Sequence, residues 1–263
     1  MDSVMVDGRR IAYHRAGSGP PLLLLHGGWS DGREWWLQLE DLSDEFDVVA
    51  WDAPGCGGSD DPPTDATLEA YADAVAGFVS ALGLGRPHVC GLSWGGGLAL
   101  AVYRRHPELP RSLVLASAYA GWRGSLPQEE VEARIRRVRE EIDRPPETWI
   151  DDYLPGFFAG EMPPEVLARV RSIMLDVRAA GTVAMLSAFA DADLRDVLPT
   201  VAVPTLLLYG DADVRSPLAV ANALHAAIPD SRLVVLPGVG HVTNLEAPAA
   251  FAAEVRRFLR SVR

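Results

Sequence analysis

Short runs rich in leucine and valine recur along this chain of 263 residues, and several of them contain no alternating polar side chains. The runs cover residues 22–25, 48–51, 88–90, 113–116, 205–209 and 233–236. Unalternated apolar runs of this length are typical of strands buried on both faces, as in a parallel sheet. Between them lie helix-like segments such as residues 68–82, with their large apolar side chains on one face. The chain is therefore predicted to form an α/β fold, with a mostly parallel central sheet flanked by helices.

The alternation of strands and helices stops between residues 121 and 193. No strand pattern is found there, whereas helical patterns cover the charged residues 129–141 and the apolar residues 183–189. Several prolines divide this stretch, which favours short helices over one long helix. We expect residues 1–120 and 194–263 to form one core domain, and residues 121–193 to form a helical cap inserted over the edge of its sheet.

Charge and composition argue against several classes of partner. The formal net charge of −12 is unfavourable for binding nucleic acid or an anionic membrane surface. The longest aliphatic run, residues 22–25, is too short to span a bilayer, and residues 1–10 lack the pattern of a secretion signal. A cytoplasmic protein is expected. Cys56 and Cys90 show no metal-ligand spacing, and both are expected to be unpaired thiols.

The stretch GLSWG, residues 91–95, follows one of the apolar runs and precedes a helical pattern. In this context the G-x-S-x-G motif has a mechanical explanation, because a serine on a tight strand-to-helix turn adopts a strained backbone conformation. Glycines two residues before and after the serine leave room for the crossing chains. The turn would expose the Ser93 hydroxyl beside the backbone N–H of Trp94, at the start of a helix. A purely structural turn is the alternative, since the motif also occurs by chance.

A serine nucleophile needs a base, usually a histidine, and a carboxylate that orients this base. His241 lies on a loop of small residues after the last apolar run, at the carboxyl end of a strand, where open α/β sheets keep their active sites. The preceding run is followed by Asp211 and Asp213. The residues alone leave open which of these two aspartates orients the histidine.

In order and spacing, Ser93, Asp213 and His241 resemble the catalytic residues of the α/β-hydrolase fold superfamily. The pattern G-x-x-D-x-x-x-P of that family matches residues 210–217, and the resemblance therefore places the acid on Asp213. The implied fold is the predicted parallel sheet with a helical cap, and the implied chemistry is a Ser-His-Asp triad.

Two further stretches are similar to the same family. LHGGW, residues 25–29, resembles its oxyanion loop, and DAPGCGGS, residues 52–59, resembles a glycine-rich turn. The resemblance assigns the oxyanion hole to the backbone N–H groups of Gly28 and Trp94. The polar side chains of these stretches are expected to hold the loops in place rather than to react: His26, Asp52 and Ser59.

A serine on the turn favours ester-type acyl transfer, because the epoxide hydrolase and haloalkane dehalogenase branches of this family carry aspartate there. We expect a serine hydrolase of small to medium apolar esters or lactones that works through an acyl-enzyme, with Trp29 and Trp122 at the substrate site. No metal or organic cofactor is expected, since the chain shows neither metal-ligand spacing nor a phosphate-binding fingerprint.

The resemblance leaves other activities open. They are a proline iminopeptidase, a hydrolase of carbon–carbon bonds, and a cofactor-free haloperoxidase or lyase. A non-catalytic protein that binds small molecules is the least expected, because every member of the triad is present. The identity of the substrate and the oligomeric state do not follow from the sequence.

Overall fold

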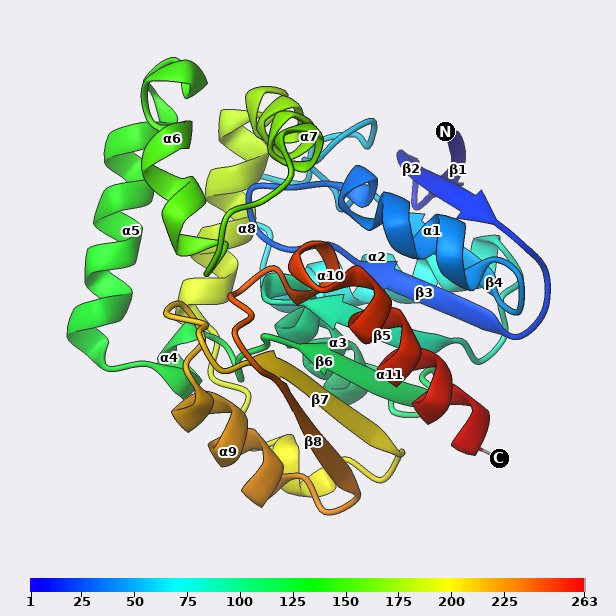
Figure 1. Ribbon diagram of the computed structural model, residues 1–263. Helices are drawn as coiled ribbons and strands as arrows, with labels where there is room; N and C mark the ends of the chain where they lie inside the picture. The colour runs from blue at the N-terminus through cyan, green and yellow to red at the C-terminus, as the bar shows by residue number, and fades with distance from the viewer. Residues whose placement is uncertain (263) are drawn as a thin grey trace.

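The computed structural model describes residues 1–262, and at its centre is an eight-stranded sheet (Figure 1). The strand order is β1-β2-β4-β3-β5-β6-β7-β8. The strands are β1 Asp2–Val6, β2 Arg9–Ala16, β3 Pro21–Leu25, β4 Asp47–Trp51, β5 His88–Leu92, β6 Ser112–Ala116, β7 Thr205–Gly210 and β8 Ser231–Leu236. β2 is antiparallel to both β1 and β4, and all the other neighbours are parallel. The predicted α/β class with a mostly parallel sheet is confirmed.

The two N-terminal strands differ from the other strands in their burial. β1 is exposed along most of its length, and the buried residues of β2 are confined to Ile11, Ala12 and Tyr13. The apolar runs of the sequence do not include these strands, because both contain polar residues: Asp2 and Ser3 in β1, and Arg9, Arg10, His14 and Arg15 in β2. They form an antiparallel edge on an otherwise parallel sheet.

The central strands β4, β5 and β6 are buried at every position, and apart from their first residues their sequences are the apolar ones that predict this. One face of the sheet is covered by α1 (Trp36–Leu42) and α11 (Pro248–Ser261), and the other by α2 (Leu68–Ala81) and α3 (Trp94–Arg105) (Figure 1). α9 (Leu218–Ala227) packs on β7 and β8. Each leucine or valine side chain fully buried between these layers stabilises the fold by about 1.5–3 kcal/mol.

The chain between β6 and β7, which the structure describes throughout, contains helices and no strand. The helices here are α4 Trp122–Ser125, α5 Gln128–Ile142, α6 Ile150–Tyr153, α7 Pro164–Leu175 and α8 Ala179–Asp191. We call α4–α8 the cap helices. They lie beyond the carboxyl ends of the strands (Figure 1). The boundaries of a separate cap domain at residues 121 and 193 stay a prediction.

Short elements complete the chain. α10 covers Thr243–Glu246, and the 3₁₀ turns are Gly32–Trp35, Pro146–Thr148, Leu154–Gly156 and Leu198–Thr200. No single helix in residues 1–262 is both long and apolar enough to cross a membrane. Taken together, α7 and α8 have the required length and composition, but the pair is bent by 96°. Cys56 and Cys90 are buried free thiols, as predicted.

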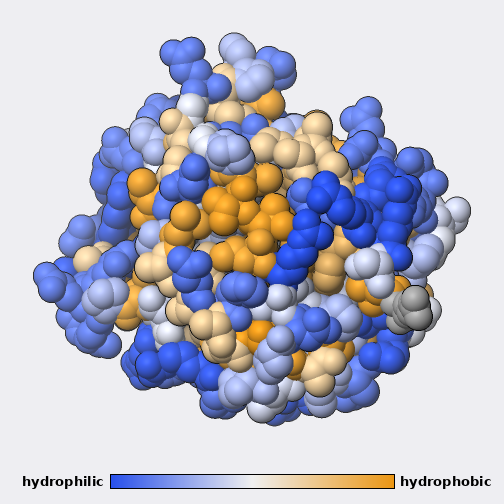
Figure 2. Space-filling view, turned by 60° about the horizontal axis from the view of Figure 1, so that its bottom comes forward, coloured by the Kyte–Doolittle hydropathy of each residue, from blue (hydrophilic) through white to orange (hydrophobic). Residues whose placement is uncertain are grey.

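The surface is mainly polar. Figure 2 shows a face that is largely hydrophilic, with hydrophobic residues gathered near its centre. The large hydrophobic side chains that are exposed in residues 1–262 are Met1, Met5, Leu175, Val214 and Val235. Most of the apolar side chains therefore contribute to the core.

Candidate active site

Ser93 lies on the tight turn between β5 and α3. Its backbone has φ 52° and ψ −111°, a left-handed conformation that is strained for a residue with a side chain. A Cβ atom at Gly91 would lie 2.2 Å from the carbonyl oxygen of Gly95, and one at Gly95 would lie 2.2 Å from that of Leu25. Both glycines are therefore required by the crossing of the backbone, which explains the motif in physical terms.

His241 contacts Asp213 through a hydrogen bond of 2.8 Å between Nδ1 and Oδ2, and both side chains are buried. The other carboxylate oxygen, Oδ1, accepts from the backbone N–H groups of Arg215 at 2.8 Å and Ser216 at 2.9 Å. An ionised carboxylate only accepts hydrogen bonds, so Nδ1 of the histidine carries the proton and Nε2 is left as an acceptor. This is the tautomer that a general base needs.

The other aspartate of this loop has a structural contact. Asp211 is exposed, and its Oδ1 accepts from the backbone N–H of Gly238 at 2.6 Å. It therefore braces two loops against each other, while Asp213 is the aspartate in contact with His241.

Burial sets the protonation of this pair. Burial lowers the pKa of His241 and outweighs the opposite effect of the Asp213 carboxylate. Burial alone would raise the pKa of Asp213, but the adjacent His241 and the backbone donors outweigh it, so the pKa of this carboxyl is lowered. At neutral pH the histidine is uncharged and the aspartate is ionised, as general-base catalysis requires.

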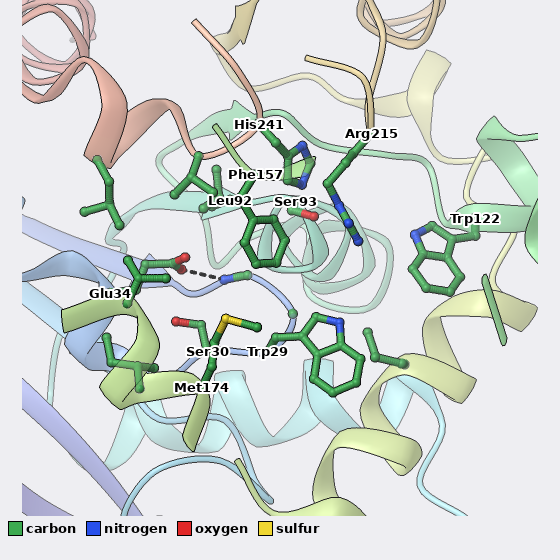
Figure 3. Close-up of a pocket in the computed structure, with 17 residues that line it drawn as sticks. Trp29, Ser30, Glu34, Leu92, Ser93, Trp122, Phe157, Met174, Arg215 and His241 are labelled. Atoms are coloured by element: carbon green, nitrogen blue, oxygen red, sulfur yellow. Dashed lines mark hydrogen bonds between the residues drawn. The ribbon is translucent and has the colours of Figure 1, made fainter. Parts of the chain in front are cut away.

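Ser93 and His241 line the same cavity, which the cap helices and the strand ends enclose (Figure 3). Its volume is at most about 640 Å³ with the open mouth included. The lining residues are mostly apolar, and from the cap helices and their connections they include Trp122, Phe157, Val170, Ile173, Met174 and Leu186. No hydrogen bond joins Ser93 to His241, and such a contact often tightens only when a substrate is bound.

The predicted oxyanion donors are Gly28, on the loop after β3, and Trp94, the first residue of α3. Gly28 lines the cavity, and neither its N–H nor that of Trp94 has a backbone or side-chain acceptor in residues 1–262. The Trp94 indole is buried away from the cavity, where it packs on His26 and Tyr71. Only the backbone of Trp94 is thus available to a substrate.

The loop that carries Gly28 is held by buried polar contacts. The N–H of Gly27 donates to Oε2 of Glu34 at 2.8 Å, and Nε2 of His26 accepts from the N–H of Ala53 at 3.1 Å. Burial raises the pKa of Glu34 to about 8, although the Gly27 N–H opposes this shift. Trp29 follows with a positive φ of 64°, and it lines the cavity.

Asp52 and Ser59, which were also predicted to hold loops in place, form hydrogen bonds to backbone groups. Asp52 accepts from the N–H groups of Gly32 at 2.8 Å and Gly58 at 2.7 Å. Ser59 accepts from the N–H of Ala12 at 2.9 Å and donates to the carbonyl of Asp52 at 2.6 Å. Their side chains are used in holding the turn.

The sequence profile of the Alpha/beta hydrolase family matches residues 22–254. The chain belongs to the Alpha/beta hydrolase family.

Similar proteins include enzymes that act on esters and lactones. This alpha/beta hydrolase is 30% identical to the pimeloyl-[acyl-carrier protein] methyl ester esterase of Nitrosomonas europaea over 249 residues, covering 92% of this chain and 97% of the relative. Its structure is similar to a thermophilic esterase from Thermogutta terrifontis, with a TM-score of 0.90, 33% identity and coverage of 100% and 99% of the two chains. It is also similar to the enol-lactonase of Burkholderia xenovorans LB400, with a TM-score of 0.90, 28% identity and coverage of 99% and 100%.

The hydrolase brings most of the predicted site residues together and adds others. Ser93, His241, Gly28, Trp29 and Trp122 all line the cavity, and Asp213 lies behind the histidine. Three polar lining residues were not predicted from the sequence, namely Ser30, Glu34 and Arg215. The same is true of the lining residues from the cap other than Trp122, and of Leu92, Val242 and Leu245 from the core. Arg215 stands two positions after Asp213, on a loop already assigned to the site, and that position was the available signal.

Proposed function

We propose that this alpha/beta hydrolase is a serine hydrolase of small to medium apolar esters or lactones. The observation that carries the proposal is the contact of 2.8 Å between His241 and Asp213, with the histidine lining the same cavity as Ser93. The mostly apolar walls, with Trp29 and Trp122 among them, suit a substrate with an apolar body.

In the proposed reaction, Oγ of Ser93 attacks the carbonyl carbon of the ester, and Nε2 of His241 takes the hydroxyl proton. The N–H groups of Gly28 and Trp94 stabilise the oxyanion of the tetrahedral intermediate. The carbon–oxygen bond to the leaving alcohol then breaks, and the histidine returns the proton to this alcohol. Water attacks the acyl-enzyme by the same route, which releases the acid and restores Ser93.

The reaction uses no metal or organic cofactor, because the chain's own residues fill each chemical role. The partner is a small-molecule substrate, and the location is cytoplasmic. Ester and lactone hydrolysis both proceed by acyl transfer to serine, which agrees with the esterase and enol-lactonase among the similar proteins.

A turnover panel tests the proposal. It contains p-nitrophenyl esters of varied acyl length, lactones, prolyl amides and vinylogous diketones, each assayed with the wild type and with Ser93→Ala. We expect turnover of an ester or lactone by the wild type and its loss in a folded Ser93→Ala protein. Turnover that survives in Ser93→Ala, or activity confined to prolyl amides or diketones, would refute the proposed function.

A further inference from the structure

Arg215 is the charged group of the cavity at neutral pH. Among the residues that line this cavity, only Glu34, His241 and Arg215 can carry a charge. The pKa of Glu34 is raised to about 8 by burial, so this carboxyl is mainly protonated at pH 7. His241 is neutral as described above. A protein with a net charge of −12 therefore has an active-site cavity with a positive charge.

No carboxylate in residues 1–262 forms a salt bridge with Arg215, unlike the arginines around it. Arg134 pairs with Glu130 at 2.6 Å, and Arg137 pairs with Glu141 at 2.9 Å. The guanidinium of Arg215 instead lies over the ring of Phe157, 4.9 Å from its centroid. An aromatic face attracts the cation but accepts none of the in-plane N–H hydrogen bonds, so these donors remain available to a ligand.

The position of Arg215 is fixed relative to the proposed catalytic residues. Its backbone N–H donates to Asp213, and its carbonyl accepts from the Tyr119 hydroxyl at 2.5 Å and from Arg134 at 2.8 Å. From this anchored backbone the side chain reaches into the cavity between Ser93 and Trp122 (Figure 3). Glu34 lies on the opposite side in the same view.

We propose that Arg215 binds a carboxylate on the substrate, so that the preferred ester or lactone has an apolar body and one anionic end. This inference rests on the proposed function and specifies its substrate class. The planar guanidinium fork matches the two oxygens of a carboxylate. One cation neutralises one carboxylate, whereas a phosphate dianion would leave a negative charge buried against apolar walls. Arg215 is thus a specificity-determining residue beside the proposed nucleophile.

A pair of substrates that differ only in charge tests this inference. The mono-p-nitrophenyl esters of adipate and suberate are compared with the corresponding terminal amides, which have the same length and leaving group. We expect the wild type to favour the carboxylate over the amide in kcat/KM. In Arg215→Met this preference should fall on the order of 10- to 100-fold, the value of a charge-assisted hydrogen bond. Arg215→Lys should keep part of it, because lysine retains the charge without the planar fork.

Arg136→Met is the matched control. Arg136 is exposed on α5, it does not line the cavity, and its loss changes the net charge by the same amount. This variant should keep the preference of the wild type. An unchanged preference in Arg215→Met, or a wild type that favours the amide, would overturn the inference while ester hydrolysis itself stands.

A binding measurement separates this inference from the proposed function. Calorimetry with hexanoate and hexanamide on Ser93→Ala should detect tighter binding of hexanoate, and the added substitution Arg215→Met should remove the difference. If no ester is hydrolysed by the wild type but hexanoate binds through Arg215, the proposed function fails and the anion site stands. If hexanoate binds no better than hexanamide, the anion site is refuted.

Discussion

Asp213→Asn should abolish most of the activity without unfolding the protein. Two backbone N–H groups, those of Arg215 and Ser216, donate to Oδ1 of Asp213. They hold an oxygen at that position, so the amide NH₂ of an asparagine must face Nδ1 of His241. Nδ1 then accepts a hydrogen bond, the proton moves to Nε2, and the histidine can no longer take the proton of Ser93. We expect kcat to fall on the order of 10⁴-fold, equivalent to about 5 kcal/mol in the activation barrier.

The matched control is Asp211→Asn, two residues earlier on the same loop. Its carbonyl oxygen can still accept from Gly238, so kcat should stay within about threefold of the wild-type value. Steady-state kinetics on one p-nitrophenyl ester give both values, and thermal unfolding checks that the variants fold. Asp213→Asn keeps both backbone hydrogen bonds and should lose only roughly 1–2 kcal/mol of stability. A kcat of Asp213→Asn within tenfold of the wild type, or a larger loss in Asp211→Asn, would refute this reasoning.

Further predictions concern the elbow, the base and the oxyanion loop. Gly95→Ala places a Cβ against backbone carbonyls and should lower the free energy of unfolding, measured by chemical denaturation, by about 3 kcal/mol or more. Gly160→Ala is the control and should be tolerated, because the atom nearest to the new Cβ would be 3.9 Å away. For a neutral ester, kcat/KM should rise with pH to a plateau as His241 loses its proton. The midpoint of this rise should lie below 6.5, because burial lowers the pKa of His241, and a midpoint above 7 would contradict this. Glu34 has its pKa raised from 4.5 to about 8 on folding, so its contribution to stability is present at low pH and is lost as pH rises through this interval. The unfolding free energy of Glu34→Gln should therefore rise relative to that of the wild type as the pH increases from 4.5 to 8. A difference between the two proteins that is the same at both pH values would refute the interpretation of Glu34 as a buried acid.

The elbow and the central strands could be predicted because their signals are local. A strand buried on both faces consists mostly of apolar residues, and the crossing backbone at Ser93 requires glycine two residues before and after it. The half-exposed strands β1 and β2 have no comparable pattern, because polar residues are acceptable on their open face. Their place in the sheet is set by backbone pairing, of β1 with β2 and of β2 with β4.

The rest of the site depends on contacts between distant segments. Phe157 and Arg215 are far apart in the sequence, and only the packing of the cap against the core places the ring beside the guanidinium. The choice of Asp213 over Asp211 followed from the family pattern. The structure supplies a physical reason for it, namely the contact of Asp213 with His241.

Covalent labelling decides most directly whether Ser93 is the nucleophile. A fluorophosphonate reacts with an activated serine, and the mass of the adduct is then located by fragmentation of the digested protein. We expect one adduct on Ser93 in the wild type, slower labelling in Asp213→Asn, and no labelling in Ser93→Ala. An adduct on Ser59 or Cys56 with Ser93 unmodified, or a wild type that hydrolyses esters without being labelled, would contradict the proposed mechanism.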